Sequence, residues 1–214
     1  MKRVRINDSV GVLDGQGRIA TGVLQAITGA KSSPTLQIQL QSIKMFDQTN
    51  PSIEIWSALP KGDHLDRMID QLAQLGVARY RPLICERSQR NPSTIRIDKL
   101  ERIAREAAKQ CHRPWGLKIE DPIRFEDAIR DPDAMIADIS GDQLQAIQSN
   151  DMRSRCVILI GPEGGWSDTE RAMIAATNVK VVRFGVFVLR IEAAASAASA
   201  IVLSSAESPI GRTS

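Results

Sequence analysis

The chain has 214 residues, of which 43% are hydrophobic and 25% charged, a composition typical of a soluble globular protein with one large or two modest domains. No stretch approaches the roughly 20 apolar residues that a membrane-spanning helix needs, and no apolar segment follows the basic residues of MKRVRINDSV, so we expect a cytoplasmic protein. The cysteines Cys85, Cys111 and Cys156 are odd in number and far apart, which excludes a disulfide framework and a CxxC zinc site, and we expect no metal.

The net charge of +3 conceals a strongly basic segment. Residues 79–113 hold ten Lys or Arg side chains against four acidic ones. Guanidinium groups pair with phosphates in a bidentate manner, so this excess indicates a polyanionic partner. A solvated charged face explains the same composition, and the charges alone do not decide between the two.

The first sixty residues have the pattern of β-structure. Their aliphatic and β-branched runs, VGVLDGQG, RIATGVLQAI, TLQIQLQSI and SIEIWSAL, are broken by Gly, Asn, Pro and Ser, and DGQG predicts a hairpin turn. This part of the chain predicts a small barrel or sandwich.

The periodicity then changes to that of helices alternating with strands. Leu65, Met68, Ile69, Leu72 and Leu75 recur at helical spacing, with Asp63 as N-cap and Gly76 as the terminating glycine. After the strand ARYRPLIC, a helix from about Asp98 to Cys111 turns a basic face outward. The further elements predicted are the strand AMIADI, the short helix DQLQAIQS, the strand CVILI, a helix capped by Ser167 to Glu170, the strand KVVRF and a helix from about Glu192. This alternation predicts a parallel sheet with helices on its faces, and the terminal SPIGRTS is expected to fray.

The stretch GPEGGWSDTE joins the strand CVILI to the helix that begins near Ser167. In open α/β sheets, ligands bind at the carboxyl ends of strands, and a glycine-rich loop lets a ligand approach the backbone. The loop is neither a Walker loop nor a dinucleotide-binding GxGxxG. A nucleoside-containing ligand held by backbone groups and a purely structural turn both remain open.

A second unusual stretch is FGVFVLRIEAAASAASAIVLSS, residues 184–205. Its Ala and Ser residues allow a neighbouring helix to pack very close. Tight internal packing and a symmetric interface between two copies explain this equally well. Arg190 and Glu192 bracket the junction from strand to helix, as a functional pair or a structural ion pair.

Together these stretches resemble a known family. GPEGGWSDTE followed by FGVFVLRIEAA is similar to the GPEGG…E and LGxRxLRxETA signatures of the SPOUT superfamily, and within it to the ribosomal RNA small subunit methyltransferase E family. KGDHLDRMIDQLAQLGVARYRPLICERSQR and REAAKQCHRP resemble further segments of that family, so the resemblance runs from about Arg3 to the end.

The resemblance implies an α/β protein of two domains. Residues 1–58 would form a small PUA-like β-barrel that helps to bind RNA, and residues 59–214 a SPOUT domain whose parallel sheet contains a trefoil knot. The family uses S-adenosylmethionine (SAM) to methylate N3 of a uridine in small-subunit ribosomal RNA. The resemblance also implies a homodimer with the active site near the interface.

The implied site residues follow from the matching motifs. The cofactor would be bound by Asp138, Ile160, Gly161, Pro162, Glu163, Gly164, Gly165, Phe184, Gly185, Leu189 and Ile191. Arg190 would stabilise negative charge on the uracil, while Glu163 or Glu192 orients Arg190 or accepts the proton. The expected phosphate contacts are Arg87, Arg90, Lys99, Arg102, Arg105 and Arg113.

The chain also departs from the family pattern. Phe187 stands where the family usually has Arg, Ala193 where it has Thr, and Gln74 where it has Glu. The family's first barrel strands are missing before Arg3, so we expect a barrel that is incomplete or completed differently. Phe187 and Ala193 favour, as an alternative, an RNA-binding protein that has lost its chemistry. A methyltransferase acting on another RNA position, such as a ribose hydroxyl in transfer RNA, is a second alternative, against which the ERS and EAxxQ segments argue.

Overall fold

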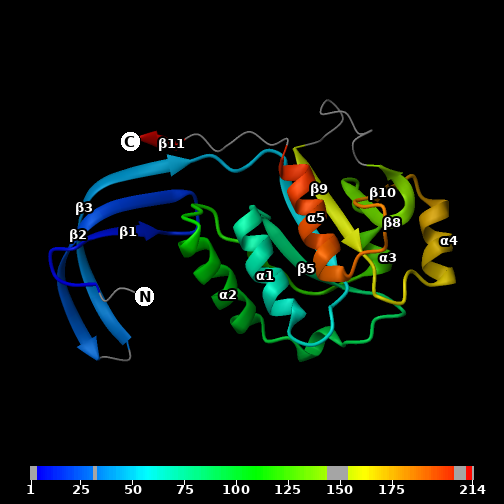
Figure 1. Cartoon of the computed structure of the whole chain (residues 1–214), viewed down its shortest axis with the longest axis horizontal. Coiled ribbons are helices and arrows are strands. Elements are labelled where there is room, and N and C mark those ends of the chain that lie inside the picture. The colour runs from blue at the N-terminus through cyan, green and yellow to red at the C-terminus, as the bar shows by residue number, and fades with distance from the viewer. Residues whose placement is uncertain (1–3, 31–32, 144–153, 205–210, 214) are drawn as a thin grey trace.

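The computed structural model describes residues 4–30, 33–143, 154–204 and 211–213 (Figure 1). In chain order the elements are β1 (Ser9–Leu13), β2 (Arg18–Ala30), β3 (Ser33–Phe46), β4 (Ser52–Ser57), α1 (His64–Leu75), β5 (Arg79–Ile84), a 3₁₀ turn (Pro92–Thr94), α2 (Ile97–Gln110), β6 (Lys118–Ile119), β7 (Ile123–Arg124), α3 (Phe125–Ala128), β8 (Ala134–Gln143), β9 (Arg155–Ile160), α4 (Asp168–Ala176), β10 (Lys180–Arg183), α5 (Ile191–Leu203) and β11 (Gly211–Thr213). The short helix predicted for DQLQAIQS falls mostly on residues 144–149, which lie outside the described residues.

A parallel sheet, the second of the two sheets in the described residues, forms the core of the protein. Its strand order is β10-β8-β9-β4-β5-β6, with β7 also beside β5, and each described pairing is parallel. The predicted parallel α/β arrangement is confirmed. Helices α1, α2 and α5 lie in front of this sheet in Figure 1.

Strand β4 is at the centre of this parallel sheet, between β9 and β5. The sequence analysis assigned SIEIWSAL to the amino-terminal β-rich unit, and this assignment is wrong. Residues 53–57 are all buried, as a strand covered on both faces must be, but a short apolar run does not reveal which sheet it joins. That residues 1–58 and residues 59–214 fold as two independent domains stays a prediction.

Helices α1 and α5 pack against each other, and α5 also contacts β4. Gly76 ends α1 in the left-handed region, with φ of 105°, as predicted. Ala195, Ala198 and Ser199 are fully buried, so close internal packing explains the small residues on the inner face of α5. Its outer face carries the exposed Ala193 and Ala200, which internal packing does not explain.

The first sheet is antiparallel, with strand order β1-β2-β3-β11. The DGQG hairpin between β1 and β2 is confirmed, and its turn contacts the second unit through Trp115. The Trp115 indole donates to the carbonyl of Phe46 at 3.0 Å, and a Cβ on Gly17 would lie 2.5 Å from the same ring. Strand β11 pairs with β3, so the prediction that the whole terminal segment frays is wrong for residues 211–213.

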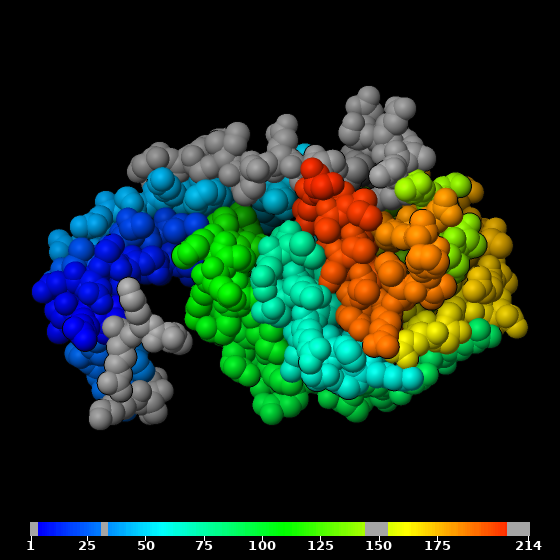
Figure 2. All heavy atoms as spheres, in the orientation of Figure 1, coloured from blue at the N-terminus to red at the C-terminus, as the bar shows by residue number. Residues whose placement is uncertain are grey.

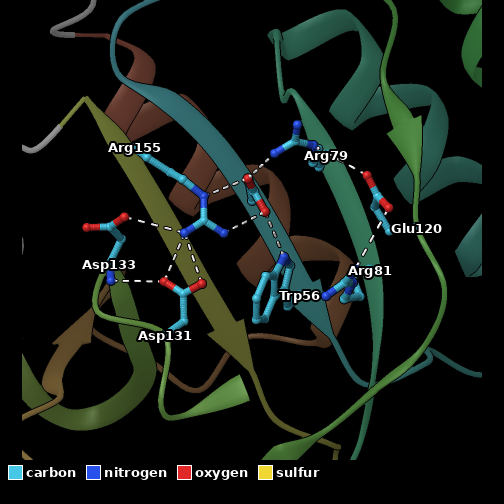
Figure 3. Close-up of polar contacts among 8 residues, drawn as sticks. Trp56, Arg79, Arg81, Glu120, Asp131, Asp133 and Arg155 are labelled. Carbon is cyan, nitrogen blue, oxygen red and sulfur yellow. Dashed lines mark hydrogen bonds and ion pairs between the residues drawn. The ribbon is translucent and has the colours of Figure 1, made fainter. Parts of the chain in front are cut away.

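A network of ion pairs covers the amino-terminal end of the parallel sheet (Figure 3). Glu54 on β4 is only 2% exposed and accepts from Arg155 Nε at 2.8 Å, Arg79 Nη1 at 2.9 Å and the Trp56 indole at 3.1 Å. Arg155 also binds Asp131 at 2.9 Å. Burial alone raises the pKa of Glu54, but the Arg155 and Arg79 guanidinium groups outweigh it and hold that pKa below its ordinary value.

Two of the cysteines are part of the core. Burial raises the pKa of the Cys85 thiol, and it raises that of Cys156 to about 12, so both are protonated at neutral pH. The described residues contain no cluster of His, Cys, Asp and Glu that could hold a metal ion. Within the described ranges, no helix is long and apolar enough to cross a membrane.

Candidate functional site

A cavity of about 240 Å³ opens at the carboxyl edge of the sheet, where β8 stops pairing with β9 at Ala137 and where the chain leaves β9 and β10. This is the edge of a parallel sheet at which ligands bind. The cavity is lined by Ala137, Asp138, Ile139, Ile160, Gly161, Pro162, Glu163, Gly165, Trp166, Arg171, Val182, Arg183, Phe184, Gly185, Phe187, Val188, Leu189, Ile191 and Ala194.

The predicted order of strand, glycine-rich loop and helix is confirmed for residues 155–176. Two of the loop glycines have structural reasons of their own. A Cβ on Gly161 would lie 2.9 Å from the Trp166 indole, which is buried against Phe125. Gly165 has φ of +69°, which a side chain disfavours. The glycines are thus explained in part by the turn itself, whatever ligand approaches it.

The segment after β5 also binds the glycine-rich loop and the helix that follows it. Ser167 and Glu170 form the predicted capping box, and the second oxygen of the buried Glu170 accepts from the backbone N–H of Glu86 at 3.0 Å. Arg87 donates to the carbonyls of Gly164 at 3.3 Å and Trp166 at 3.1 Å. Residues 86–87 therefore fix the shape of the loop.

The structure brings almost all the predicted cofactor residues together. Ten of the eleven line the cavity, from Asp138 on β8 to Ile191 at the start of α5. The exception is Gly164, which lies instead against Arg87. Whether these residues bind a cofactor stays a prediction that geometry alone does not test.

The three predicted catalytic residues are near one another in the chain fold but are not joined by direct contacts. Glu163 lines the cavity and pairs with Lys61 Nζ at 2.9 Å. Glu192 lies 3.3 Å from His64 Nδ1. Arg190 is exposed at the N-cap of α5, and within the described residues it forms no ion pair with either carboxylate.

An apolar segment is exposed at the mouth of the cavity. Val186, Phe187 and Val188 are 77%, 79% and 83% exposed, and Phe187 and Val188 also line the cavity. Three consecutive apolar side chains in water are uncommon on a monomer surface, so this segment indicates a contact with another molecule.

Three of the six predicted phosphate contacts donate to backbone carbonyls instead. Arg113 donates to the carbonyls of Ala73 at 2.8 Å, Gly76 at 3.0 Å and Val77 at 2.7 Å, and burial lowers its pKa to about 10. Arg90 donates to the carbonyls of Pro60 at 3.0 Å and Gly62 at 3.3 Å. Together with Arg87, these side chains hold backbone turns in place.

The other three predicted contacts lie on the exposed face of α2. Lys99 pairs with Asp66, whereas Arg102 and Arg105 are exposed and form no hydrogen bond or salt bridge within the part of the chain that the structure describes. Figure 2 shows the molecule hollowed between the first sheet and α2. Arg102 and Arg105 are therefore accessible to a partner.

The cavity at the carboxyl edge of a mostly parallel α/β sheet defines a class of ligand-binding α/β proteins, and comparison with known proteins identifies the family. Residues 48–203 match the family model of the RNA methyltransferase domain. The chain therefore belongs to the RNA methyltransferase domain family.

The curated relatives confirm the resemblance predicted from the motifs. Ribosomal RNA small subunit methyltransferase E of Synechocystis sp. is 28% identical over 88% of this chain and 63% of the relative. The protein of the same name from Aquifex aeolicus is 30% identical over 61% of this chain and 58% of the relative, and that from Rickettsia conorii is 26% identical over 94% and 82%. The chain thus spans less than two thirds of the length of the Synechocystis and Aquifex relatives.

Solved structures share the fold. A methyltransferase of Legionella pneumophila in complex with SAM superposes with a TM-score of 0.81 at 21% identity, covering 95% of this chain and 86% of that one. Ribosomal RNA small subunit methyltransferase E from Neisseria gonorrhoeae, bound to SAM, has a TM-score of 0.76 at 24% identity, covering 94% and 84%. At these identities the likeness shows the fold alone.

Sequence reasoning missed several residues at the site. Lys61, on the loop between β4 and α1, contacts Glu163, and His64, the first residue of α1, contacts Glu192. Arg171 lines the cavity. Lys61 and His64 are far in sequence from the carboxylates that they contact, and Arg171 is in an ordinary helix turn. Only for Lys61 did a signal exist, because it begins the KGD segment of the family resemblance.

Proposed function

We propose that the protein uses SAM to methylate N3 of a uridine in small-subunit ribosomal RNA. The observation that carries this proposal is the cavity formed at the carboxyl edge of the sheet by strand β8 and the loops that follow β9 and β10, in a chain of the RNA methyltransferase domain family. The names of the curated relatives and the SAM bound in two structures of this fold support the substrate and the cofactor.

The residues of the cavity suit SAM. Phe184, Leu189 and Ile191 supply apolar walls for an adenine ring, while the loop from Gly161 to Gly165 offers backbone polar groups to a nucleoside. Asp138 adds a carboxylate. When bound, SAM supplies a methyl group on a positively charged sulfur.

The residues beside the cavity would act on the RNA base. N3 of uracil carries a proton that must leave as the nitrogen attacks, and negative charge then develops on the carbonyl oxygens. Arg190, exposed between the cavity residues Leu189 and Ile191, would stabilise this charge. Because neither Glu163 nor Glu192 contacts Arg190, the contacts favour proton acceptance over orientation of Arg190 as the role of these carboxylates.

One observation favours a second candidate, an RNA-binding protein without catalysis. Phe187 lies at the mouth of the cavity where the family usually has Arg, so a cation that could act on the substrate is absent from that position. Such a protein would bind RNA without turnover.

We also propose that two copies of the chain associate through residues 186–189 and the outer face of α5, so that the active site lies near the interface. The exposure of three consecutive apolar residues supports this surface. Light scattering that gives the mass of a single chain would contradict it.

The finer features of the fold are proposals as well. We propose that strand β8 and the two loops around the cavity belong to a trefoil knot and that the first sheet is part of a PUA-like barrel that helps to bind RNA. The convergence of the loops on one cavity and the antiparallel order β1-β2-β3-β11 support these assignments. A crystal structure tracing residues 144–153 between β8 and β9 would decide whether the chain is knotted.

The first test is titration calorimetry of the purified protein with SAM. We expect saturable binding at micromolar concentration, which Gly165→Trp abolishes because the indole fills the cavity. Gly15→Trp is the matched control, since Gly15 has φ of +70° against +69° for Gly165 and lies in the remote β1-β2 turn. Equal loss of binding in both variants would mean that misfolding is responsible.

Methylation assays on small-subunit ribosomal RNA complete this test. Methyl transfer to a uridine, mapped to N3, supports the enzyme. SAM binding without transfer to RNA or to assembled subunits favours the second candidate, and absence of SAM binding by the folded protein contradicts the proposed function.

The exposed face of α2 should determine how RNA binding depends on salt. Each phosphate contact removed lowers the slope of log K against log salt concentration by about 0.7 for single-stranded RNA. Replacing Lys99, Arg102 and Arg105 with Gln should therefore lower the slope by about 2 if all three contact phosphates. Binding of a ribosomal RNA fragment between about 50 and 200 mM salt measures it.

Arg130→Gln is the control for this experiment. Arg130 is 76% exposed and pairs with Asp127 at 3.4 Å beyond the end of α3, away from α2. Its loss should leave the slope unchanged. An unchanged slope in the triple α2 variant would exclude this face as the phosphate-binding surface.

A further inference from the structure

A loosely engaged charge pair lies in the wall of the cavity. Arg171 on α4 and Asp138 on β8 both line it, and Arg171 Nη1 is 3.8 Å from Asp138 Oδ2. This distance is beyond hydrogen-bonding range, so the two groups attract each other without using their donor and acceptor positions. Both remain able to bind a ligand.

Asp138 is held so that one oxygen stays available. Its Oδ1 accepts from the backbone N–H of Ser140 at 2.9 Å and from the Ser140 hydroxyl at 2.7 Å. Its side chain is 14% exposed, and Oδ2 is the oxygen nearer to Arg171. The hydrogen bonds of Oδ1 therefore fix the orientation of the Asp138 carboxylate, while Oδ2 faces Arg171.

The position of Arg171 is not explained by the stability of its helix. A cation near the amino end of a helix opposes the helix dipole, which the neighbouring Asp168 and Glu170 satisfy instead. Its guanidinium lies close to Gly165, where an added Cβ would be 3.9 Å from Nη2. Arg171 thus extends over the glycine-rich loop toward the cavity.

The other charged groups of the cavity are placed differently. Glu163 pairs with Lys61. Arg183, at the end of β10, lines the cavity but forms no ion pair within the described part of the chain. Arg171 and Asp138 are the oppositely charged lining residues that lie within 4 Å of each other.

We propose that this pair binds the α-amino-carboxylate group of the cofactor, with Arg171 donating to the carboxylate and Asp138 accepting from the ammonium. The inference rests on the proposed function, that the cavity takes SAM. A guanidinium matches a carboxylate with two parallel hydrogen bonds, and a carboxylate is the natural acceptor for an ammonium. The pair would distinguish cofactors that carry an amino acid from nucleosides that do not.

The test compares two ligands that share the thioether nucleoside. S-adenosylhomocysteine carries the α-amino-carboxylate, and methylthioadenosine lacks it. We expect the protein to prefer S-adenosylhomocysteine, and Arg171→Gln to weaken that ligand by about 10- to 100-fold while leaving methylthioadenosine unchanged, since charge-assisted hydrogen bonds are lost from one ligand only. Asp138→Asn should reduce the same preference, and Arg130→Gln, at a residue that is not part of the cavity, should not. Arg183→Gln tests the other cation that lines the cavity.

The outcomes are separable. If the unmodified protein binds neither ligand, the proposed function fails and this inference with it. If it binds both equally, or if Arg171→Gln weakens both to the same extent, the proposed function stands and the role of Arg171 is overturned. Loss of the preference in Arg183→Gln instead of Arg171→Gln would assign the carboxylate to Arg183 and also overturn it.

Discussion

Replacing Arg190 with alanine should lower the turnover number for RNA methylation about 100- to 1,000-fold, the usual effect of removing one charge-stabilising donor from a transition state. SAM affinity should not change, because the proposed contact of Arg190 is with the uracil. Single-turnover methylation at saturating SAM, together with calorimetric titration, measures the two quantities separately.

The structure makes Arg190 a clean target for substitution. Its side chain is exposed, whereas Arg87, Arg90 and Arg113 each hold backbone carbonyls. Removing Arg190 therefore should not disturb the fold, and circular dichroism can verify this. Arg190→Lys, which keeps the charge but loses the planar fork, should be intermediate, and unchanged turnover in Arg190→Ala would exclude the proposed role.

Replacing Glu54 with alanine should lower the free energy of unfolding by about 2–3 kcal/mol, because the buried carboxylate accepts charge-assisted hydrogen bonds from two guanidinium groups whose side chains are 31% and 43% exposed. Glu54 is the residue on which Arg155, Arg79 and the Trp56 indole converge (Figure 3). Urea denaturation at neutral pH measures the loss. A change in unfolding free energy no larger than that of an exposed residue would contradict the prediction.

The stabilisation by Glu54 should depend on pH in a defined direction. Its pKa in the folded protein lies below the ordinary value of 4.5, so the carboxylate stabilises the fold fully above that value. The stabilisation is lost as the pH falls from there through the lower folded-state pKa. Glu54→Leu should lack this component of the acid dependence.

A double variant separates the charge from the packing. Replacing both partners, as in Glu54→Leu with Arg155→Met, removes the buried charge and the cation it leaves behind. Because Arg155→Met also takes the cation away from Asp131 and Asp133, we expect the double variant to be no more stable than Glu54→Leu alone. Its SAM affinity should equal that of the unmodified protein, because the network and the cavity are at opposite ends of strand β9.

The sequence was most informative where a motif combined unusual residues in a fixed order. The loop of GPEGG and the segment from Phe184 to Ile191 were predicted to meet, and they line the same cavity. That prediction came from the family resemblance, and the meeting of the two segments has a physical reason, because parallel strands bring their carboxyl ends to one edge.

The basic segment was harder to interpret because an arginine binds a carbonyl oxygen and a phosphate oxygen with the same donors. Arg113 was predicted to contact RNA, yet it makes three hydrogen bonds to the end of α1. Arg102 and Arg105 retain the predicted exposure. Sequence gives the charge of each residue but not its burial.

Long-range pairing was the other limit. Strand β11 has three residues, Gly211–Thr213, and shows no alternation from which a strand could be predicted. Arg171 and Asp138 are on separate elements, and nothing in either segment indicates that they meet. Such contacts depend on the tertiary fold and become visible only when the strands are placed.

The pairing of β3 with β11 has a consequence for the order in which the protein folds. The whole parallel sheet lies between these two strands in sequence, so the antiparallel sheet reaches its complete form only after the segment between them has been synthesised. Contacts between residues so distant in sequence slow folding, because a long loop must close before the contact is gained. During synthesis, the edge of β3 that pairs with β11 therefore stays without this partner while the rest of the chain folds.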